Sequence, residues 1–273
     1  MLLKNKVQES LEYIRPLIPL QPEIAVILGS GMGAFADYLE NTVTIAAGDI
    51  PHYPVSTVPG HAGAWRIGNK NHIPVICIQG RVHYYEGYTL EQVSYPVHLL
   101  AGLGIKTLIV TTACGGLNPD FRPGDMMLIR DHINFGFGNP LIGRPENLLG
   151  PWFPDMSEPY DSALQEIALS AAAEKGIQLQ RGVFCWVTGP SYETAAEVRM
   201  LRKLGGDAVS MSTVPEVIVA NQRHIRTLGI SLITNMATGL AAGKLTHQEV
   251  TDMAHLAGEK LNALLDAIIR KMS

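Results

Sequence analysis

Residues 80–88 read Gly80-Arg81-Val82-His83-Tyr84-Tyr85-Glu86-Gly87-Tyr88 and come just after the apolar run 73–78. A short apolar run that ends at glycine predicts a buried strand, and ligands of α/β proteins bind beyond the carboxyl ends of strands. Arg81 and His83 are two residues apart, so they share one face of an extended chain and suit an anion such as phosphate. Glu86 is placed to orient the His83 ring through its second nitrogen. The alternative interpretation is a polar surface loop with a salt bridge.

Strands and helices alternate on both sides of this stretch. Further buried strands are predicted at 23–28, 42–47, 106–110, 126–133, 182–188, 207–211 and 228–233. Helices are predicted at 7–15, 34–39, 90–103, 162–175 and 195–204, near 214, and from 247 onward. Residues 134–160 are rich in Gly, Pro and Asn and predict a long functional loop or an oligomer contact. The alternation predicts one α/β domain over residues 1–273, built on a central parallel or mixed sheet surrounded by helices.

A second candidate site follows the first predicted strand, where residues 29–33 read Gly29-Ser30-Gly31-Met32-Gly33. A glycine turn between a strand and a helix lets backbone N–H groups approach an oxyanion, and Ser30 adds a hydroxyl donor. The dinucleotide fingerprint requires its third glycine one position later. Asp49, about twenty residues further on as in that fingerprint, keeps an NAD-type oxidoreductase open as an alternative.

Other predicted strand ends also carry polar groups. His61 lies in the loop 51–63, which is punctuated by proline and glycine. The candidate anion donors of the chain are Ser30, His61, Arg81, His83 and Ser212. Glu193 and Asn235 are candidates to hydrogen-bond a ligand that contains a polar ring. Candidates for the walls of such a site are the aromatic or polarizable side chains of Tyr85, Tyr192 and Met211. Neither a metal-binding constellation nor a G-x-S-x-G nucleophile motif is present in the sequence.

The composition narrows the classes of function. The 273 residues are 47% hydrophobic and 17% charged, with a formal net charge of -4 and no block of Lys or Arg. A nucleic-acid or membrane-surface partner is therefore disfavoured. The sequence shows neither a signal peptide nor the roughly 18 consecutive apolar residues that span a bilayer. The three cysteines lack metal-binding spacing and predict no disulfide framework, which indicates a reducing cytoplasm.

Several segments together resemble one enzyme family, the trimeric purine nucleoside phosphorylases. The matching segments are Gly29-Ser30-Gly31-Met32-Gly33, Ser56-Thr57-Val58-Pro59-Gly60-His61-Ala62-Gly63, the stretch 80–88, Gly189-Pro190-Ser191-Tyr192-Glu193-Thr194 and Met211-Ser212-Thr213-Val214-Pro215-Glu216-Val217. The resemblance implies a single α/β domain with a mixed, partly barrel-like sheet and a homotrimer. It also implies that phosphate cleaves purine nucleosides, expected to be of the inosine and guanosine type, into free base and (deoxy)ribose 1-phosphate in purine salvage. No metal or organic cofactor is expected.

The resemblance also implies a role for each matching residue. Phosphate would be held by Ser30, His61, Arg81, His83, the backbone of Ala113, and Ser212. The ribose would be lined by Tyr85, Met211 and His247, with Phe153 as the candidate that arrives from a neighbouring subunit. The purine would be held by Tyr192, Glu193, Val209 and Asn235. The catalytic set would be His83, Glu193 and Asn235.

Two positions depart from the family pattern. Thr112 stands where these enzymes usually have asparagine, and the run 111–115 is similar instead to methylthioadenosine phosphorylases. Those enzymes carry aspartate where this chain has Asn235 and lack the stretch 85–88, so 6-oxopurine nucleosides remain the expected substrates. Met236 replaces a lysine of some relatives. A non-catalytic nucleoside-binding protein is a further alternative, but a plain nucleoside offers no phosphate for the predicted anion donors.

Overall fold

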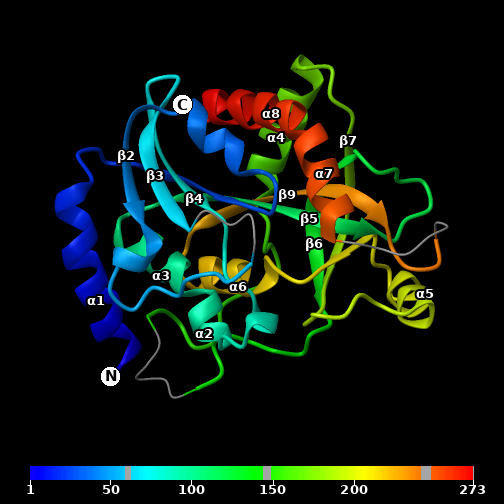
Figure 1. Ribbon diagram of the computed structural model, residues 1–273, viewed down its shortest axis with the longest axis horizontal. Coiled ribbons are helices and arrows are strands. Elements are labelled where there is room, and N and C mark those ends of the chain that lie inside the picture. Colours follow the sequence, from blue (N-terminus) through cyan, green and yellow to red (C-terminus); the bar gives the residue numbers. More distant parts are fainter. Residues whose placement is uncertain (59–62, 144–148, 241–246, 273) are drawn as a thin grey trace.

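A mixed sheet forms the centre of the molecule (Figure 1). The structure is a computed structural model that describes residues 1–58, 63–143, 149–240 and 247–272. Within these residues the sheet has nine strands in the order β2-β3-β4-β1-β5-β8-β7-β6-β9. Their bounds are β1 Ile24–Leu28, β2 Glu40–Ala46, β3 Ala64–Lys70, β4 Ile73–Gln79, β5 Thr107–Gly116, β6 Met126–Asn134, β7 Leu179–Trp186, β8 Ala208–Ser210 and β9 Arg226–Met236.

Half of this sheet closes on itself. β9 pairs with β5 in parallel and with β6 in antiparallel orientation. β6 continues to β7 and β7 to β8, and β8 returns to β5. These five strands form a ring, from which β1, β4, β3 and β2 extend as an open wing. The expected α/β fold with a mixed, partly barrel-like sheet is therefore confirmed.

Helices cover both faces of the sheet. The α-helices are α1 Leu3–Ile14, α2 Leu90–Val93, α3 Tyr95–Gly102, α4 Ser162–Glu174, α5 Ala195–Lys203, α6 Val214–Gln222, α7 His247–Leu256 and α8 Gly258–Lys271, with short 3-10 helices η1 Arg15–Leu17, η2 Gly33–Tyr38, η3 Ala47–Asp49 and η4 Tyr84–Glu86. Alternate β1 side chains enter different cores: Val26 packs in the cluster that contains α4 and α8, and Ile27 in the cluster that contains α1, α3 and α6. Figure 1 shows the same two layers, with α4 and α8 opposite α1 and α6.

The structure corrects four sequence expectations about elements. β3 was not predicted, because Gly68 and the polar residues beside it hide a strand whose backbone passes close to β2: a Cβ at Gly68 would lie 2.6 Å from the Glu40 carbonyl oxygen. The single helix expected over 90–103 is two helices, with Pro96 in the first turn of α3. The helix expected from 247 onward is α7 and α8, which meet at Ala257. The helix expected over 34–39 is the 3-10 helix η2.

The strand directions place the polar segments together. β1 runs parallel to β4 and to β5, and β5 runs parallel to β9. Their carboxyl ends therefore lie at the same edge of the sheet, where ligands of α/β proteins bind. The segments that leave this edge are the turn after β1, the stretch 80–88 after β4, and the last residues of β5 and β9.

Candidate active site

A cavity lies at this edge of the sheet. It holds about 700 Å³ of space between atoms, part of which is open to solvent. Eleven of the predicted site residues line it, and they come from segments far apart in the sequence. They are Ser30, Arg81, His83, Tyr85, Ala113, Tyr192, Glu193, Val209, Met211, Ser212 and Asn235.

Three predicted site residues are not brought to the cavity by the described structure. His61 lies outside the described residues. His247 is the first residue of α7, and its side chain is outside what the structure describes, although Val250 of the same helix lines the cavity. Phe153 is 83% exposed and lines a separate surface cavity with Trp152. Phe153 was predicted to reach the ribose pocket of a neighbouring subunit, and this contact stays a prediction.

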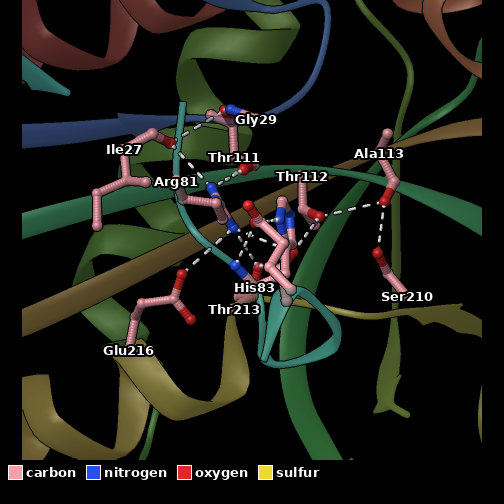
Figure 2. A network of polar contacts seen from close by, with 12 residues as sticks. Ile27, Gly29, Arg81, His83, Thr111, Thr112, Ala113, Ser210, Thr213 and Glu216 are labelled. Carbon is pink, nitrogen blue, oxygen red and sulfur yellow. Dashed lines mark hydrogen bonds and ion pairs between the residues drawn. The ribbon is translucent and has the colours of Figure 1, made fainter. Parts of the chain in front are cut away.

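Arg81 forms the centre of a buried polar network (Figure 2). Its Nη1 donates hydrogen bonds to Ser212 Oγ at 3.1 Å and to Thr213 Oγ1 at 3.0 Å. Its Nη2 donates to the carbonyl oxygens of Thr111 at 2.5 Å and Ile27 at 3.4 Å. A further ion pair joins Nη1 to Glu216 Oε1 at 3.6 Å. The guanidinium is thus fixed at the cavity wall by β1, β5 and the start of α6.

Thr213 holds an unusual backbone conformation next to this guanidinium. Its φ is 80° and its ψ is -52°, and the N–H of Val214 donates to the Ser212 carbonyl oxygen at 3.0 Å. This geometry is a γ-turn, which is rare and strained for a residue that carries a Cβ. Such strain costs about 1–3 kcal/mol and persists where the surroundings enforce it. The turn directs the hydroxyls of Ser212 and Thr213 at Arg81.

His83 is oriented by Glu86, as the sequence predicted. His83 Nδ1 lies 2.9 Å from Glu86 Oε1, and the His83 backbone N–H donates to the same oxygen at 2.7 Å. The His83 ring stacks on Tyr85 at 4.7 Å between centroids. The backbone N–H of Thr57 donates to Glu86 Oε2 at 2.6 Å. Glu86 therefore fixes the orientation of the His83 ring at the cavity wall.

Glu86 also makes the free energy of unfolding depend on pH. Partial burial acts to raise the pKa of Glu86, but hydrogen bonds from Thr57 and His83 outweigh it and lower the pKa from 4.5. A carboxyl with a depressed folded-state pKa stabilises the fold above its unfolded pKa, and this contribution disappears as the pH falls through the folded-state pKa. We expect Glu86→Gln to lower the free energy of unfolding at pH 7 by about 1–3 kcal/mol. Urea titrations of both proteins should show this gap shrinking below pH 4.5; a gap that stays constant down to acid pH contradicts the assignment.

The lining of the cavity also includes an acid and an amide. Glu193 is 9% exposed, and its burial raises the pKa of its carboxyl. It directly precedes Thr194, whose hydroxyl caps α5 by accepting from the N–H of Glu197 at 3.3 Å. Asn235 ends β9, and its Oδ1 accepts from Thr234 Oγ1 at 3.0 Å while its Nδ2 donates to the Met236 carbonyl oxygen at 3.2 Å. A rigid cap and a strand end therefore position these two polar groups.

Some residues of the cavity were not among the predicted site residues. Ser210 Oγ donates to the Ala113 carbonyl oxygen at 2.8 Å, and the Thr112 hydroxyl lies 3.0 Å from Ser212 Oγ. Both side chains therefore support groups that were predicted. Thr234 and Cys114 also line the wall. The sequence signal for all four was the run of small residues at the ends of β5, β8 and β9.

The structure also bears on the alternatives. The turn after β1 leads into the 3-10 helix η2 and not into the α-helix that a dinucleotide fingerprint requires, and Asp49 is exposed away from the cavity. Among the described residues, no group of three or more His, Cys, Asp or Glu side chains is arranged to hold a metal ion. No helix in the described part of the chain has the length and apolar character needed to cross a membrane.

Comparison with known proteins identifies the family. The sequence model of the phosphorylase superfamily matches residues 23–270. The chain is 49% identical over 267 residues to purine nucleoside phosphorylase 1 of Bacillus subtilis, covering 98% of each chain. It is 44% identical over 269 residues to the purine nucleoside phosphorylase of Bos taurus, covering 96% of this chain and 93% of that one.

Solved structures agree with this result. The Schistosoma mansoni purine nucleoside phosphorylase in complex with adenosine has a TM-score of 0.93 at 35% identity, with 98% of each chain covered. The same enzyme in complex with inosine has a TM-score of 0.92 at 35% identity, with 98% of this chain and 96% of that one covered. The chain therefore belongs to the phosphorylase superfamily. Within it, the expected purine nucleoside phosphorylase family, and with it a pentosyltransferase activity, is confirmed.

Proposed function

We propose that this enzyme cleaves 6-oxopurine nucleosides with inorganic phosphate, releasing the free base and (deoxy)ribose 1-phosphate for purine salvage. One observation carries the proposal: a single cavity is lined by the cation Arg81 with the hydroxyl of Ser212 and also by Glu193 and Asn235. A nucleoside together with phosphate presents groups complementary to all of these side chains. The proposed reaction needs no cofactor, because phosphate is the second substrate.

The phosphate would bind at Arg81. We assign its contacts to Ser30, His61, Arg81, His83, the backbone of Ala113, and Ser212. Arg81 supplies a planar donor fork that suits phosphate oxygens. His83 lines the same cavity, with its ring held by Glu86. Phosphate therefore sits beside the sugar carbon that it attacks.

The sugar would lie between the phosphate and the base, against Tyr85, Met211 and His247. Cleavage of the bond from C1′ to N9 leaves an oxocarbenium-like sugar and a purine anion. A phosphate dianion beside C1′ stabilises the positive sugar and then bonds to it, while the electron pair of the broken bond stays on the purine. Catalysis is thus mainly positioning and charge stabilisation.

The base would lie against Tyr192 and Val209, with its polar edge at Glu193 and Asn235. An ionised Glu193 accepts from the N1–H of a 6-oxopurine. Asn235 can present its NH₂ to N7 or O6 as charge builds on the ring. Adenine offers a lone pair at N1, which faces the carboxylate unfavourably. This contrast supports inosine and guanosine as the preferred substrates.

A substrate panel tests this preference. Inosine, guanosine, their deoxy forms, adenosine and methylthioadenosine would be assayed for free base with phosphate present. We expect the kcat/KM of inosine and guanosine to exceed that of adenosine. A preference for adenosine or methylthioadenosine would mean that Thr112 was the better guide to the substrate.

We further propose that residues 1–273 work as one phosphorylase domain in a cytoplasmic homotrimer. Cys77, Cys114 and Cys185 are all buried free thiols, as a reducing compartment keeps them. Large apolar side chains gather on the surface near the loop 134–160. Phe137 and Ile142 are each 80% exposed, and Trp152 stacks on the exposed Phe153 at 5.1 Å. Such exposed apolar groups favour a subunit contact.

Phe153→Ala tests whether a neighbour completes the ribose pocket. The wild type is expected to elute as a trimer in light scattering. The variant should raise the KM for inosine by about tenfold, as expected for loss of a buried aromatic anchor, while the KM for phosphate changes little. Tyr38→Ala, another exposed aromatic outside the loop, serves as control. A fully active wild-type monomer would end this proposal.

A further inference from the structure

Glu216 is a buried acid outside the lining of the cavity. It lies in the first turn of α6, and its side chain is 1% exposed. Its Oε1 is 3.6 Å from Arg81 Nη1, and no other side chain of the described residues hydrogen-bonds the carboxylate. Burial raises the pKa of this carboxyl, and the backbone N–H groups of Glu216 and Thr213 act against that rise. Figure 2 shows Glu216 reaching Arg81 from the side of α6. None of the roles assigned above uses this carboxylate.

Glu216 is not needed to orient the guanidinium. Arg81 already donates to four neutral acceptors: the hydroxyls of Ser212 and Thr213, and the carbonyl oxygens of Thr111 and Ile27. These acceptors come from β1, β5 and the strained turn before α6, so they hold the guanidinium plane from several directions. The distance to Glu216 is longer than a hydrogen bond. The contribution of Glu216 to Arg81 is therefore its charge.

That charge acts strongly because the pair is buried. Burial lowers the pKa of Arg81 and raises the pKa of Glu216, and each partner opposes the shift of the other. Arginine stays protonated in proteins, so a carboxylate beside it compensates the cation while the cavity is empty. Charges interact over longer distances in a poorly screened interior than in water. An anion bound to Arg81 therefore also meets the repulsion of Glu216.

We propose that Glu216 is the internal counter-ion of Arg81 and sets how tightly the cavity holds phosphate and the sugar phosphate product. The inference rests on the proposed function, because it needs Arg81 to bind phosphate. Without Glu216 the uncompensated cation holds a dianion more tightly and releases the product more slowly. With Glu216 present, the cavity binds phosphate and the sugar phosphate less tightly and releases them faster.

Calorimetric titration with inorganic phosphate tests the inference. Glu216→Gln keeps the size of the side chain and removes the charge, so the Kd for phosphate should fall by about fivefold or more, as one buried charge contact suggests. Inhibition by ribose 1-phosphate should strengthen by a similar factor. Glu174→Gln, which removes a surface carboxylate paired with Arg270 and Lys271, should leave both values unchanged. An unchanged or raised Kd in Glu216→Gln overturns the inference.

Two further variants keep the test decisive. Glu216→Asp retains the charge but withdraws it by one methylene, so phosphate should bind about twofold more tightly as the repulsion weakens with distance; weaker binding overturns the inference even if Glu216→Gln does not fold. Arg81→Ala distinguishes the proposed phosphate site from the counter-ion role of Glu216. If phosphate binding survives in Arg81→Ala, the proposed phosphate site is wrong. If it is lost there while Glu216→Gln binds phosphate like the wild type, only the counter-ion role fails.

Discussion

Arg81→Ala should raise the KM for phosphate far more than the KM for inosine and should lower kcat/KM for phosphate by about a hundredfold or more. The guanidinium is the cation of the polar network at the cavity wall, and it is fixed there by four hydrogen bonds. Alanine removes the donor fork and leaves the Ser212 and Thr213 hydroxyls without their shared partner. Steady-state kinetics with each substrate varied in turn would measure the split.

Arg226→Ala provides a matched control for this change. Arg226 pairs with Asp161 at 2.6 Å on the surface and does not line the cavity. Its removal changes the net charge by the same amount and should leave the phosphate dependence as in the wild type. A phosphate dependence that is the same in Arg81→Ala and in the wild type would contradict the assignment of Arg81.

Glu193→Ala should reduce kcat/KM for inosine and guanosine by about tenfold to a hundredfold, the value of a hydrogen bond to a charged group. The carboxylate is buried in the lining of the cavity, so water replaces it poorly.

Asn235→Asp should raise adenosine cleavage relative to inosine, because a protonated aspartate donates to N7 and accepts from the 6-amino group. The measurement is the ratio of specificity constants for inosine and adenosine in the wild type and both variants.

Controls and pH sharpen this second prediction. Glu12→Ala removes an exposed carboxylate of α1 that does not line the cavity and should leave the base ratio unchanged. Because burial raises the pKa of Glu193, its accepting form is lost as the pH falls through that raised pKa. The kcat/KM for inosine should therefore decline toward acid pH in the wild type and decline less steeply in Glu193→Ala. An identical acid limb in both proteins would contradict the role of the carboxylate.

Much of the fold follows from local sequence patterns. β1 and β4 are uninterrupted apolar runs because both faces of a parallel sheet are covered, and such runs are easily recognised. β3 was not predicted because Gly68, which close packing against β2 requires, interrupts its short alternation of apolar and polar residues. The break between α7 and α8 was missed because the apolar spacing continues through Ala257. The spacing of apolar residues shows which face of a helix is buried, but it does not show where one helix ends and the next begins.

The same distinction applies to the site. The His83–Glu86 contact was predictable because the two residues are three apart in one tight turn. The convergence of Arg81 with Asn235 was predictable from the common edge where the parallel strands β4 and β9 end. The arrival of Glu193 was not, because it follows β7, which runs antiparallel to β9. The pairing of Arg81 with Glu216 was not, because the partners are distant in sequence and Glu216 sits in an apolar helix. The strained turn at Thr213 likewise depends on tertiary contacts that no local motif encodes.

Phosphate, and not water, is the proposed nucleophile in this cavity. An assay of inosine cleavage that follows hypoxanthine and ribose 1-phosphate together, with and without inorganic phosphate, tests this directly. We expect equimolar formation of both products with phosphate and almost no hypoxanthine without it. Hypoxanthine release at the same rate without phosphate, accompanied by free ribose, would contradict it.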